Sequence, residues 1–464
     1  MSKPSIPQGT RDFSPVVVRK RQYIFNTLRS IFELYGFQPL ETPAMENLTT
    51  LTGKYGEEGD RLIFKILNNG LHEKNEAGKE KLNTEWNKVL SKAYSSPEVT
   101  ERALRYDLTI PFARYVVMNQ NDIAFPFKRY QMQPVWRADR PQKGRYREFW
   151  QCDADVVGST SLINEAELLC IYQAAFMQLQ VPVKIKINSR KLLAAIAELC
   201  GTPEKMIDIT VALDKLDKIG WDGVTKELRE RGIDDDGINK IEKVINVTGD
   251  NDARLAALSE IMKDCAIGLE GIKELRTSLC YYDGLSDKSW NGIIEVDISL
   301  ARGLNYYTGV IVEVVCESDK VKMGSIGGGG RYDDLTGLFG LKGLSGVGIS
   351  FGIDRIYDVM EELCVFPEQL ASGAKVILLN FGGDNEQYAI SVLKQLRTAG
   401  ISAELYPDAA KFDKQMKYAN KRNMAYVILP GDEEREKGMV SLKNFLTGEQ
   451  KMMMLNECIG LLSA

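Results

Sequence analysis

Amide and guanidinium side chains that could bind an anionic ligand concentrate in the segment 128–155, KRYQMQPVWRADRPQKGRYREFWQCDAD. Its alternating polarity predicts two β-strands joined by a short basic loop at residues 141–144. Because successive side chains on a strand point to opposite faces, one face of this hairpin is apolar and the other polar. The predicted polar face carries Gln131, Gln133, Arg137, Arg147, Gln151 and Asp155. The apolar face can pack on a core and leave the polar face as a platform for a ligand.

The charges of this segment favour a polyphosphate as that ligand. Between residues 128 and 147 there are seven basic side chains and a single acid, Asp139. Guanidinium groups bind phosphate oxygens in pairs and keep their charge at any working pH. The alternative is an ordinary solvated sheet face, but solubility alone would mix the two signs of charge. The excess of one sign therefore favours a binding site.

A second group of candidates lies in the segment 104–115, LRYDLTIPFARY. Asp107 and Thr109 are two residues apart, so in an extended segment they face the same way and could hold an ammonium group. The equal alternative is an Asp-x-Thr cap at the start of a helix.

Two glycine-containing segments also carry candidates, each with a structural alternative. The segment 299–310, SLARGLNYYTGV, offers Arg302 and the phenols of Tyr306 and Tyr307. On a strand, adjacent tyrosines point to opposite faces, so we expect one in the core and one in a pocket. In GSIGGGGRYDDL, residues 324–335, four glycines either allow close approach of a ligand or form a flexible turn.

A strand that enters a helix is predicted for residues 345–356, SGVGISFGIDRI, and the helix carries Arg355. This arginine could bind a ligand or form a surface ion pair. No Walker loop or dinucleotide-binding fingerprint accompanies any of these segments.

Composition limits the chemistry and the location of the protein. The chain has 464 residues, of which 44% are hydrophobic and 27% charged, as in a soluble protein of two or three domains. No apolar run is long enough to span a bilayer, and the N-terminus lacks an apolar signal core, so we expect a cytoplasmic protein without a membrane partner. The net charge of −5 does not mark a nucleic-acid binder, so any RNA contact depends on local basic patches.

The cysteines and the histidine exclude several kinds of site. The eight cysteines form no CxxC pair and are expected to be reduced and mostly buried. The one histidine, His72, lies in a charged segment, which excludes His-based triads and His-rich metal sites. The chemistry must therefore use arginine, lysine, carboxylates, tyrosine or the substrate's own groups.

The pattern of elements divides the chain into modules. Residues 16–36 predict an amphipathic helix, and 68–103 a polar, charged surface insertion. Residues 189–284 are highly charged and predict an inserted, mainly helical module. Strand character returns from 292 to 315, and strands alternate with helices from about 374 to the end, which indicates a separate α/β domain.

In their order and chemistry these segments closely resemble the histidyl-tRNA synthetases, a family of class II aminoacyl-tRNA synthetases. The resemblance begins at GTRDF (9–13) and continues into the C-terminal α/β domain. The basic hairpin resembles motif 2 of the class, and GISFGIDR (348–355) resembles motif 3. ARGLNYYTG (301–309) and GGGGRYDDL (327–335) resemble the two histidine-specific signatures. Asn305 departs from the aspartate that is common in the family, and Asp155 stands where many bacterial members have glutamate.

The resemblance implies an α+β class II catalytic domain, an antiparallel sheet with flanking helices, made of residues 1–188 and 285–365. The segment 68–103 would be a surface insertion of this domain. Residues 189–284 would form a helical insertion domain beside the tRNA acceptor stem, and 374–464 an α/β anticodon-binding domain. The implied activity is that of a homodimeric histidine–tRNA ligase with L-histidine, ATP and tRNA(His) as substrates. Mg²⁺ would accompany ATP, with no permanently bound cofactor and no metal held by the protein.

Position within the motifs implies a role for each candidate. Arg302 and Arg137 are expected to be catalytic at the α-phosphate of ATP, with Arg302 in a place that relatives give to a metal ion. The expected ATP-binding residues are Arg137, Arg147, Arg302 and Arg355. The expected histidine-binding residues are Asp107, Thr109, Gln151, Asp155, Tyr306 and Tyr307. Arg140 and Gln142 are expected to contact the acceptor end of the tRNA.

A regulatory paralogue that senses histidine for ATP phosphoribosyltransferase is the main alternative. Such paralogues tend to lack the C-terminal domain and the ATP-binding arginines. This chain keeps Arg137, Arg302 and Arg355 together with the additional domain, which favours the enzyme.

Overall fold

The computed structural model describes residues 3–91, 96–287, 293–301, 306–371, 373–445 and 447–463. The chain forms two compact units. One consists of Met1–Arg11 with Ile24–Val365, and the other of Asp12–Tyr23 with Phe366–Ala464. The helix α1 (Pro15–Leu34) contributes to both units. Among the described helices, none has both the length and the apolar character that crossing a membrane requires.

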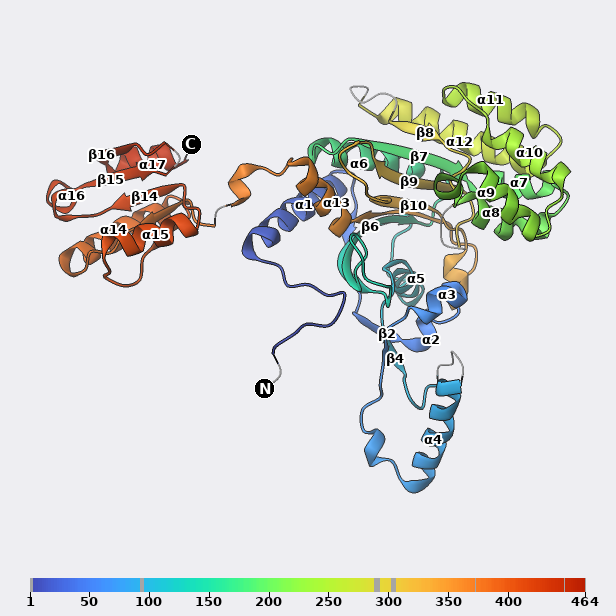
Figure 1. Ribbon diagram of the computed structural model, residues 1–464, viewed down its shortest axis with the longest axis horizontal. Coiled ribbons are helices and arrows are strands. Elements are labelled where there is room, and N and C mark those ends of the chain that lie inside the picture. Colours follow the sequence, from blue (N-terminus) through green and yellow to red (C-terminus); the bar gives the residue numbers. More distant parts are fainter. Residues whose placement is uncertain are drawn as a thin grey trace. The chain divides into compact units, whose positions relative to one another are not determined.

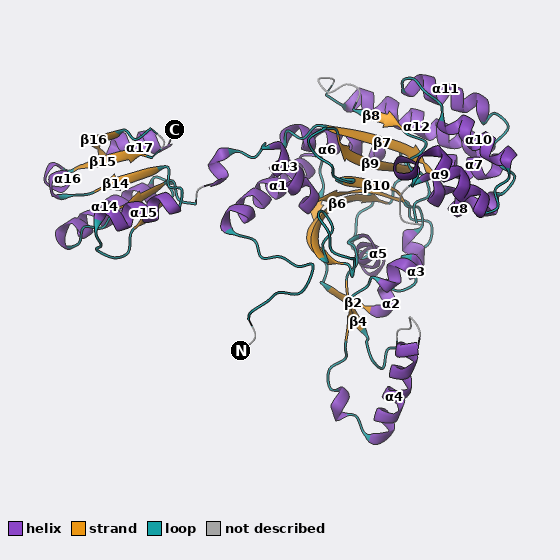
Figure 2. Cartoon of the chain, in the orientation of Figure 1, coloured by secondary structure: helices purple, strands orange, loops and turns teal. Residues whose placement is uncertain are grey.

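The larger unit is built on an eight-stranded sheet in the order β1-β5-β6-β11-β10-β9-β7-β8 (Figure 2). The two edge pairs, β1 with β5 and β7 with β8, are parallel, and the other neighbours are antiparallel. The strands are β1 (Gln38–Pro39), β5 (Phe127–Trp136), β6 (Glu148–Val157), β7 (Val183–Ser189), β8 (Ile294–Val296), β9 (Val310–Cys316), β10 (Gly327–Arg331) and β11 (Gly346–Gly352). The predicted antiparallel sheet with flanking helices is confirmed.

One face of this sheet is covered by helices and is apolar. Phe351 of β11 has its ring centroid 5.8 Å from that of Phe32 in α1 and 4.7 Å from that of Tyr172 in α6 (Ile163–Gln178). Cys152 and Ala154 of β6 are fully buried on the same side as Phe351. The predicted alternation of the hairpin therefore holds, and the opposite face is left for polar groups. A further helix, α13 (Ile353–Leu363), follows β11 directly.

The basic loop of the hairpin is longer than predicted. Regular pairing ends at Trp136 and resumes at Glu148, so the connection is residues 137–147 rather than 141–144. A hydrogen bond of 2.9 Å from the Arg137 N–H to the Arg147 carbonyl continues the ladder by one step. The two arginines thus lie opposite each other at the start of the loop.

A small three-stranded sheet and several helices lie beside the polar face. The sheet has the order β2-β4-β3. Its parts and the neighbouring helices are β2 (Met45–Asn47), α2 (Leu48–Leu51), α3 (Gly56–Arg61), β3 (Lys65–Ile66), η1 (Leu71–Glu73), α4 (Glu76–Ser91), β4 (Arg102–Leu104) and α5 (Thr109–Met118). The segment 68–103 contains α4, which extends away from the small sheet (Figure 1) and has no buried residue.

A helical module follows β7 in the larger unit, and its helices gather beside β7 and β8 (Figure 2). They are α7 (Arg190–Leu199), η2 (Pro203–Lys205), α8 (Met206–Leu213), α9 (Leu216–Glu230), α10 (Asp235–Ile245), α11 (Asn251–Ile261) and α12 (Ala266–Leu285). Aspartates cap two of them, since Asp234 accepts from the N–H of Gly237 and Asp250 from that of Ala253, each at 2.8 Å. A 3₁₀ turn, η4 (Leu335–Phe339), follows β10.

The smaller unit has a five-stranded sheet in the order β13-β12-β14-β15-β16. β12 pairs in parallel with both β13 and β14, whereas β15 and β16 are antiparallel additions that periodicity did not predict. The elements are η5 (Glu368–Ala371), β12 (Val376–Leu378), α14 (Gly383–Thr398), β13 (Ala403–Leu405), α15 (Phe412–Lys421), β14 (Tyr426–Leu429), α16 (Asp432–Lys437), β15 (Met439–Asn444), β16 (Gln450–Met454) and α17 (Leu455–Ser463).

The four glycines at 327–330 form a central strand, not a flexible turn. They lie between β9 and β11, where neighbouring backbones come very close. A Cβ atom at Gly329 would lie 2.1 Å from the carbonyl oxygen of Gly348, and one at Gly330 would lie 2.6 Å from that of Val310. Only residues without a side chain fit this spacing, so glycine here serves close packing.

Replacement of Gly329 by alanine should lower the free energy of unfolding by about 3 kcal/mol or more, because its Cβ would meet backbone atoms that cannot move alone. Gly352→Ala at the end of β11 is the matched control, since its Cβ would meet nothing nearer than 3.5 Å. The control should change stability by less than about 1 kcal/mol. Denaturant unfolding of both variants checks this, and equal effects would contradict the packing argument.

Candidate active site

Two cavities open on the polar face of the eight-stranded sheet and share part of their walls. The smaller has a volume of about 70 Å³ and the larger of about 290 Å³. Residues of β6, β10 and β11 contribute to both. The side chains or backbones common to the two are Arg137, Gln151, Gly328 and Ser350. A ligand group in one cavity can therefore lie next to a group in the other.

The smaller cavity brings together all six residues that the sequence suggested for binding an amino acid. They come from β6, from the start of α5 and from the loop before β9, and they are Asp107, Thr109, Gln151, Asp155, Tyr306 and Tyr307. Arg137 lines both cavities, and Arg355 lines the larger one. Arg302 and Asn305 lie outside the described residues.

Three candidates lie elsewhere. Arg147 is absent from the described walls of both cavities, and its guanidinium donates to the carbonyls of Asp139 at 3.1 Å and Gln8 at 3.4 Å. Arg140 and Gln142 are exposed on the loop 137–147. Arg145, which the sequence analysis passed over, does line the larger cavity.

Arg137 is held rigidly at the junction of the cavities. Its Nε donates to the Tyr106 carbonyl at 3.0 Å. The centre of its guanidinium lies 4.3 Å from the ring centroid of Tyr106 and 5.2 Å from that of Phe149. Stacking and the backbone bond fix the plane of the group, so its remaining N–H donors have set directions.

Arg355 is fixed by the backbone at the far side of the larger cavity. Its Nε donates to the Gly144 carbonyl at 2.8 Å, and its Nη1 to the Ser325 carbonyl at 2.6 Å. Nearby, Arg11 forms an ion pair with Asp354 and stacks 3.3 Å from the ring centroid of Tyr146. The larger cavity is therefore basic, with aromatic rings in its wall, which suits a nucleotide polyphosphate.

Asp155 is buried at the inner end of the smaller cavity and is engaged on both oxygens. Arg129, fully buried, lies 3.0 Å away through Nη2, and the Tyr332 hydroxyl donates to Oδ1. Burial raises the pKa of the Asp155 carboxyl above its ordinary value, although Arg129 opposes the shift. A Cβ at Gly348 would lie 1.9 Å from Oδ1, so glycine there leaves room for the carboxylate.

Asp107 lies at the start of a helix and also lines the smaller cavity. Its Oδ1 accepts from the Tyr55 hydroxyl at 2.9 Å and from the Ile110 N–H at 3.2 Å, at the start of α5. The segment is helical from Thr109, so of the two alternatives the helix start, and not the extended segment, describes the local structure. Burial raises the pKa of Asp107, and the charge of Arg137 opposes this.

Tyr306 and Tyr307 both line the smaller cavity, contrary to the prediction that one would be buried in the core. They lie in a turn before β9 and not on a strand, so the rule of alternating faces does not apply to them. Their ring centroids are 4.9 Å apart. Burial raises the pKa of each phenol, which keeps both as neutral donors.

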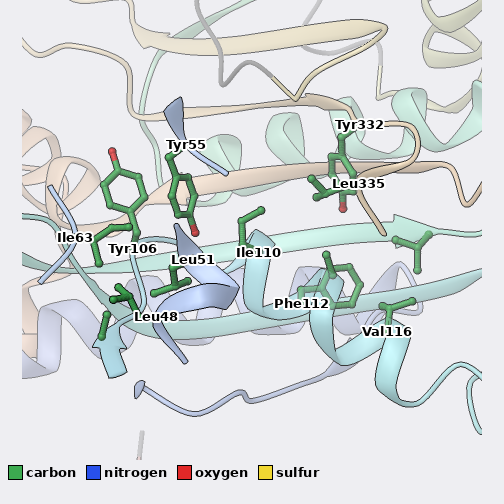
Figure 3. Close-up of a cluster of buried hydrophobic side chains, with 13 residues drawn as sticks. Leu48, Leu51, Tyr55, Ile63, Tyr106, Ile110, Phe112, Val116, Tyr332 and Leu335 are labelled. Atoms are coloured by element: carbon green, nitrogen blue, oxygen red, sulfur yellow. The ribbon is translucent and has the colours of Figure 1, made fainter. Parts of the chain in front are cut away.

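Sequence reasoning missed four residues that support this cavity: Tyr55, Arg129, Asp153 and Tyr332. Arg129 and Asp153 lie on the polar face at the same two-residue spacing as Gln151 and Asp155, so alternation could have found them. Tyr332 follows the glycine run that was already singled out. Tyr55 carries no local signal, because only tertiary packing brings it to Asp107. Figure 3 shows Tyr55 and Tyr332 in the apolar cluster that also contains Tyr106, Ile110 and Leu335.

Comparison with known proteins places these features in a family. A family model described as "Histidyl-tRNA synthetase" matches residues 82–356, more than half of the chain, and one described as "Anticodon binding domain" matches 375–464. The chain is 52% identical over 462 residues to a histidine–tRNA ligase of Bacteroides fragilis, covering 100% of this chain and 99% of that protein. It is 54% identical over 464 residues to one of Christiangramia forsetii, covering 99% of each.

Solved structures agree with these relatives. The histidyl-tRNA synthetase of Nostoc sp. PCC 7120 matches with a TM-score of 0.83 at 28% identity, over 100% of this chain and 99% of that one. A structure titled ATP phosphoribosyltransferase regulatory subunit/histidyl-tRNA synthetase, from Bacillus halodurans C, has a TM-score of 0.70 at 19% identity, over 90% of this chain and 97% of that one. The second likeness shows the fold alone.

The pH dependence of stability should reveal the buried Asp153. Burial, with Asp155 nearby, raises the pKa of Asp153 to about 7. An unfolded aspartate ionises near pH ~4, so between about pH 4 and 7 the folded state keeps a proton that the unfolded state loses, and stability falls as pH rises. Asp153→Asn cannot ionise, so relative to wild type it should become more stable as pH rises through this window. Denaturant unfolding at pH 5 and pH 8 measures the change.

The same substitution at the exposed Asp319 is the control for removing one charge from the chain. Asp319→Asn should shift stability by a similar small amount at both pH values. A constant difference between Asp153→Asn and wild type would contradict the raised pKa of Asp153.

Proposed function

Because the chain belongs to the histidyl-tRNA synthetase family, we propose that its smaller cavity binds L-histidine and its larger cavity binds ATP. The protein is a histidine–tRNA ligase, a class II aminoacyl-tRNA synthetase. It activates L-histidine with ATP to histidyl-adenylate and pyrophosphate, and then transfers the histidyl group to the 3′-terminal adenosine of tRNA(His). One observation carries the division of roles: the smaller cavity gathers the six predicted histidine-binding residues and shares Arg137 and Gln151 with the basic cavity.

The inner end of the smaller cavity would read the imidazole ring. A neutral imidazole has one nitrogen that donates a hydrogen bond and one that accepts. Asp155 would accept from the ring N–H, and the phenol of Tyr307 would donate to the other nitrogen, with Tyr306 packed beside it. A wrong side chain in this small cavity would leave the buried polar groups without hydrogen-bond partners. The cavity would therefore discriminate strongly against other amino acids.

The outer end of the smaller cavity would hold the α-ammonium and α-carboxylate groups. Gln151 donates through Nε2 to the Ser350 hydroxyl at 3.1 Å, which leaves Oε1 to accept from an ammonium group. Asp107 and Thr109 face the same space. The histidine carboxylate would then lie beside Arg137, at the point where the two cavities meet.

The first step is an in-line attack of the histidine carboxylate on the α-phosphorus of ATP, with pyrophosphate as the leaving group. The carboxylate is already a nucleophile and needs no general base. Arg137, fixed by Tyr106 and Phe149, would stabilise the negative charge that grows on the α-phosphate oxygens. Arg302 is proposed for the same task from its place in the ARGLNYYTG segment.

The rest of ATP would lie along the larger cavity. Arg355, held by two backbone carbonyls, would bind the far end of the bent nucleotide, with Arg145 as a further cation. Arg147 is proposed to contribute less to ATP binding, since its guanidinium donates hydrogen bonds to backbone carbonyls. Mg²⁺ is proposed to accompany ATP, where it would neutralise negative charge on the phosphates.

The second step needs contacts with the tRNA. The 3′-hydroxyl of the terminal adenosine attacks the acyl carbonyl, the acyl–phosphate bond breaks and AMP leaves, and a phosphate oxygen of the adenylate could accept the hydroxyl proton. Arg140 and Gln142, exposed on the loop 137–147, are the proposed contacts for the acceptor end. The helical insertion 189–284 would lie against the acceptor stem. The C-terminal domain, 374–464, would bind the anticodon, in agreement with the matching domain model.

The assembly and location are further parts of the proposal. The catalytic domain would comprise 1–188 and 285–365, with 68–103 as its surface insertion, and would form a homodimer. The enzyme would act in the cytoplasm and carry no permanently bound cofactor.

Arg137→Ala and Arg302→Ala should each lower histidine-dependent ATP–pyrophosphate exchange by roughly 100-fold to 1000-fold, because each removes a cation from the transition state. Lys143→Ala is the control, since Lys143 lies on the same loop, is 70% exposed and pairs with Glu362 at the surface. It should keep exchange within about 2-fold of wild type. Thermal melts check that the variants are folded. Wild-type exchange in either arginine variant would refute that residue's role.

A further inference from the structure

Residues that line the smaller cavity have four buried oxygen atoms without a hydrogen-bond donor among the described residues. One of them, Oδ2 of Asp155, lies 3.0 Å from Nη2 of Arg129 in an ion pair. The other three are Oδ2 of Asp107, Oε1 of Gln151 and Oδ1 of Asp153. All three residues line the cavity, and the Asp153 residue is only 3% exposed. A buried acceptor without a donor is costly, so three of them around one small space indicate a ligand that supplies several donors.

Asp153 differs in this respect from its neighbour Asp155. Asp155 already has Arg129 at 3.0 Å and the hydroxyl of Tyr332. Asp153 has a hydrogen bond to the Ser350 side chain, and its Oδ1 is buried without a partner. The Ser350 hydroxyl also accepts from Gln151, so this one group sets the direction of both acceptors.

The place of Asp153 on the strand indicates which part of histidine it would meet. Gln151, Asp153 and Asp155 follow one another along the polar face of β6, with about 7 Å between successive members. With the ring at Asp155 and the carboxylate at Arg137, the α-carbon lies between the two ends. The α-ammonium group is the part of histidine that lies at that position, and it has three N–H donors for three acceptors.

We propose that Asp153 accepts a hydrogen bond from the α-ammonium group of histidine and, with Asp107 and Gln151, completes a cradle of three acceptors. This inference rests on the proposed binding of histidine in the smaller cavity. It makes Asp153 a determinant of selectivity for amino acids over analogues that lack the amine.

The charges around Asp153 agree with this role. Arg129 on β5 faces it as a cation, while Asp155 on β6 and Asp107 before α5 face it as acids. The phenols of Tyr172 and Tyr307 are the other titratable groups nearby. Burial and the two acids raise the pKa of Asp153 to about 7. An ammonium group would favour the ionised carboxylate, so amine binding should strengthen as pH rises through neutrality.

The test uses two compounds that differ only in the amine, histidinol and 3-(imidazol-4-yl)propan-1-ol. Their dissociation constants are measured by calorimetry or by inhibition of histidine-dependent exchange, on full-length wild type, Asp153→Asn and Asp155→Asn. In Asp153→Asn the preference for histidinol should fall by roughly 10-fold to 100-fold, because a hydrogen bond to a charged group is lost. Asp155→Asn is the matched control: it should weaken both compounds and leave their ratio within about 2-fold.

A ratio that is unchanged in Asp153→Asn would overturn the inference. If Asp153→Asn does not fold, the pH dependence of the two dissociation constants on wild type tests the inference instead. After correction for the ring and amine titrations of the two compounds, the preference for histidinol should rise between pH 6 and pH 8, and a flat profile would overturn the inference. Wild type that lacks histidine-dependent exchange would instead refute the proposed function, so the two failures are distinguishable.

Discussion

The buried ion pair between Arg129 and Asp155 is the constraint around which the site is arranged. The two side chains are 0% and 4% exposed, and their closest atoms are 3.0 Å apart. Such burial costs several kcal/mol per ion unless geometry and further hydrogen bonds compensate. Tyr332 supplies one of these bonds, and the glycine at 348 provides the space. Asp153 and Asp107 add two more buried acids nearby, so the residues of the cavity have an excess of acceptors that a substrate with N–H donors would satisfy.

The sheet makes this arrangement possible because one face packs against helices and the other carries the cavities. Phe351 packs against Phe32 and Tyr172 on the covered face, and this aromatic core fixes the strands. On the other face, the glycines of β10 leave the surface bare, so that the cavities form above the strands. The rigid placement of Arg137 and Arg355 by backbone carbonyls follows the same principle, since preorganised charges need little rearrangement during the reaction.

Much of this architecture follows from the sequence, and the exceptions have physical causes. Alternation in 128–155 predicted the faces of the hairpin because the period of a strand does not depend on its partners. The glycine run was interpreted as a turn or a ligand-binding segment because glycine is intrinsically poor in strands, and only the neighbouring strands show why it is required there. The segment around Asp107 and Thr109 was ambiguous locally, and in the structure it begins a helix where Asp107 accepts from the Tyr55 hydroxyl, a residue distant in sequence. Arg147 was expected at a ligand from its place on the polar face, but the loop turns its guanidinium toward backbone carbonyls.

The central claim is that the smaller cavity selects histidine for activation at the junction with the ATP cavity. The most direct measurement is amino-acid-dependent ATP–pyrophosphate exchange by the purified protein, with each of the twenty amino acids tested separately. The account predicts exchange with histidine alone, because the imidazole holds its donor and its acceptor at the two positions in one ring that Asp155 and Tyr307 would meet. Exchange with a different amino acid, or none with histidine, would contradict it.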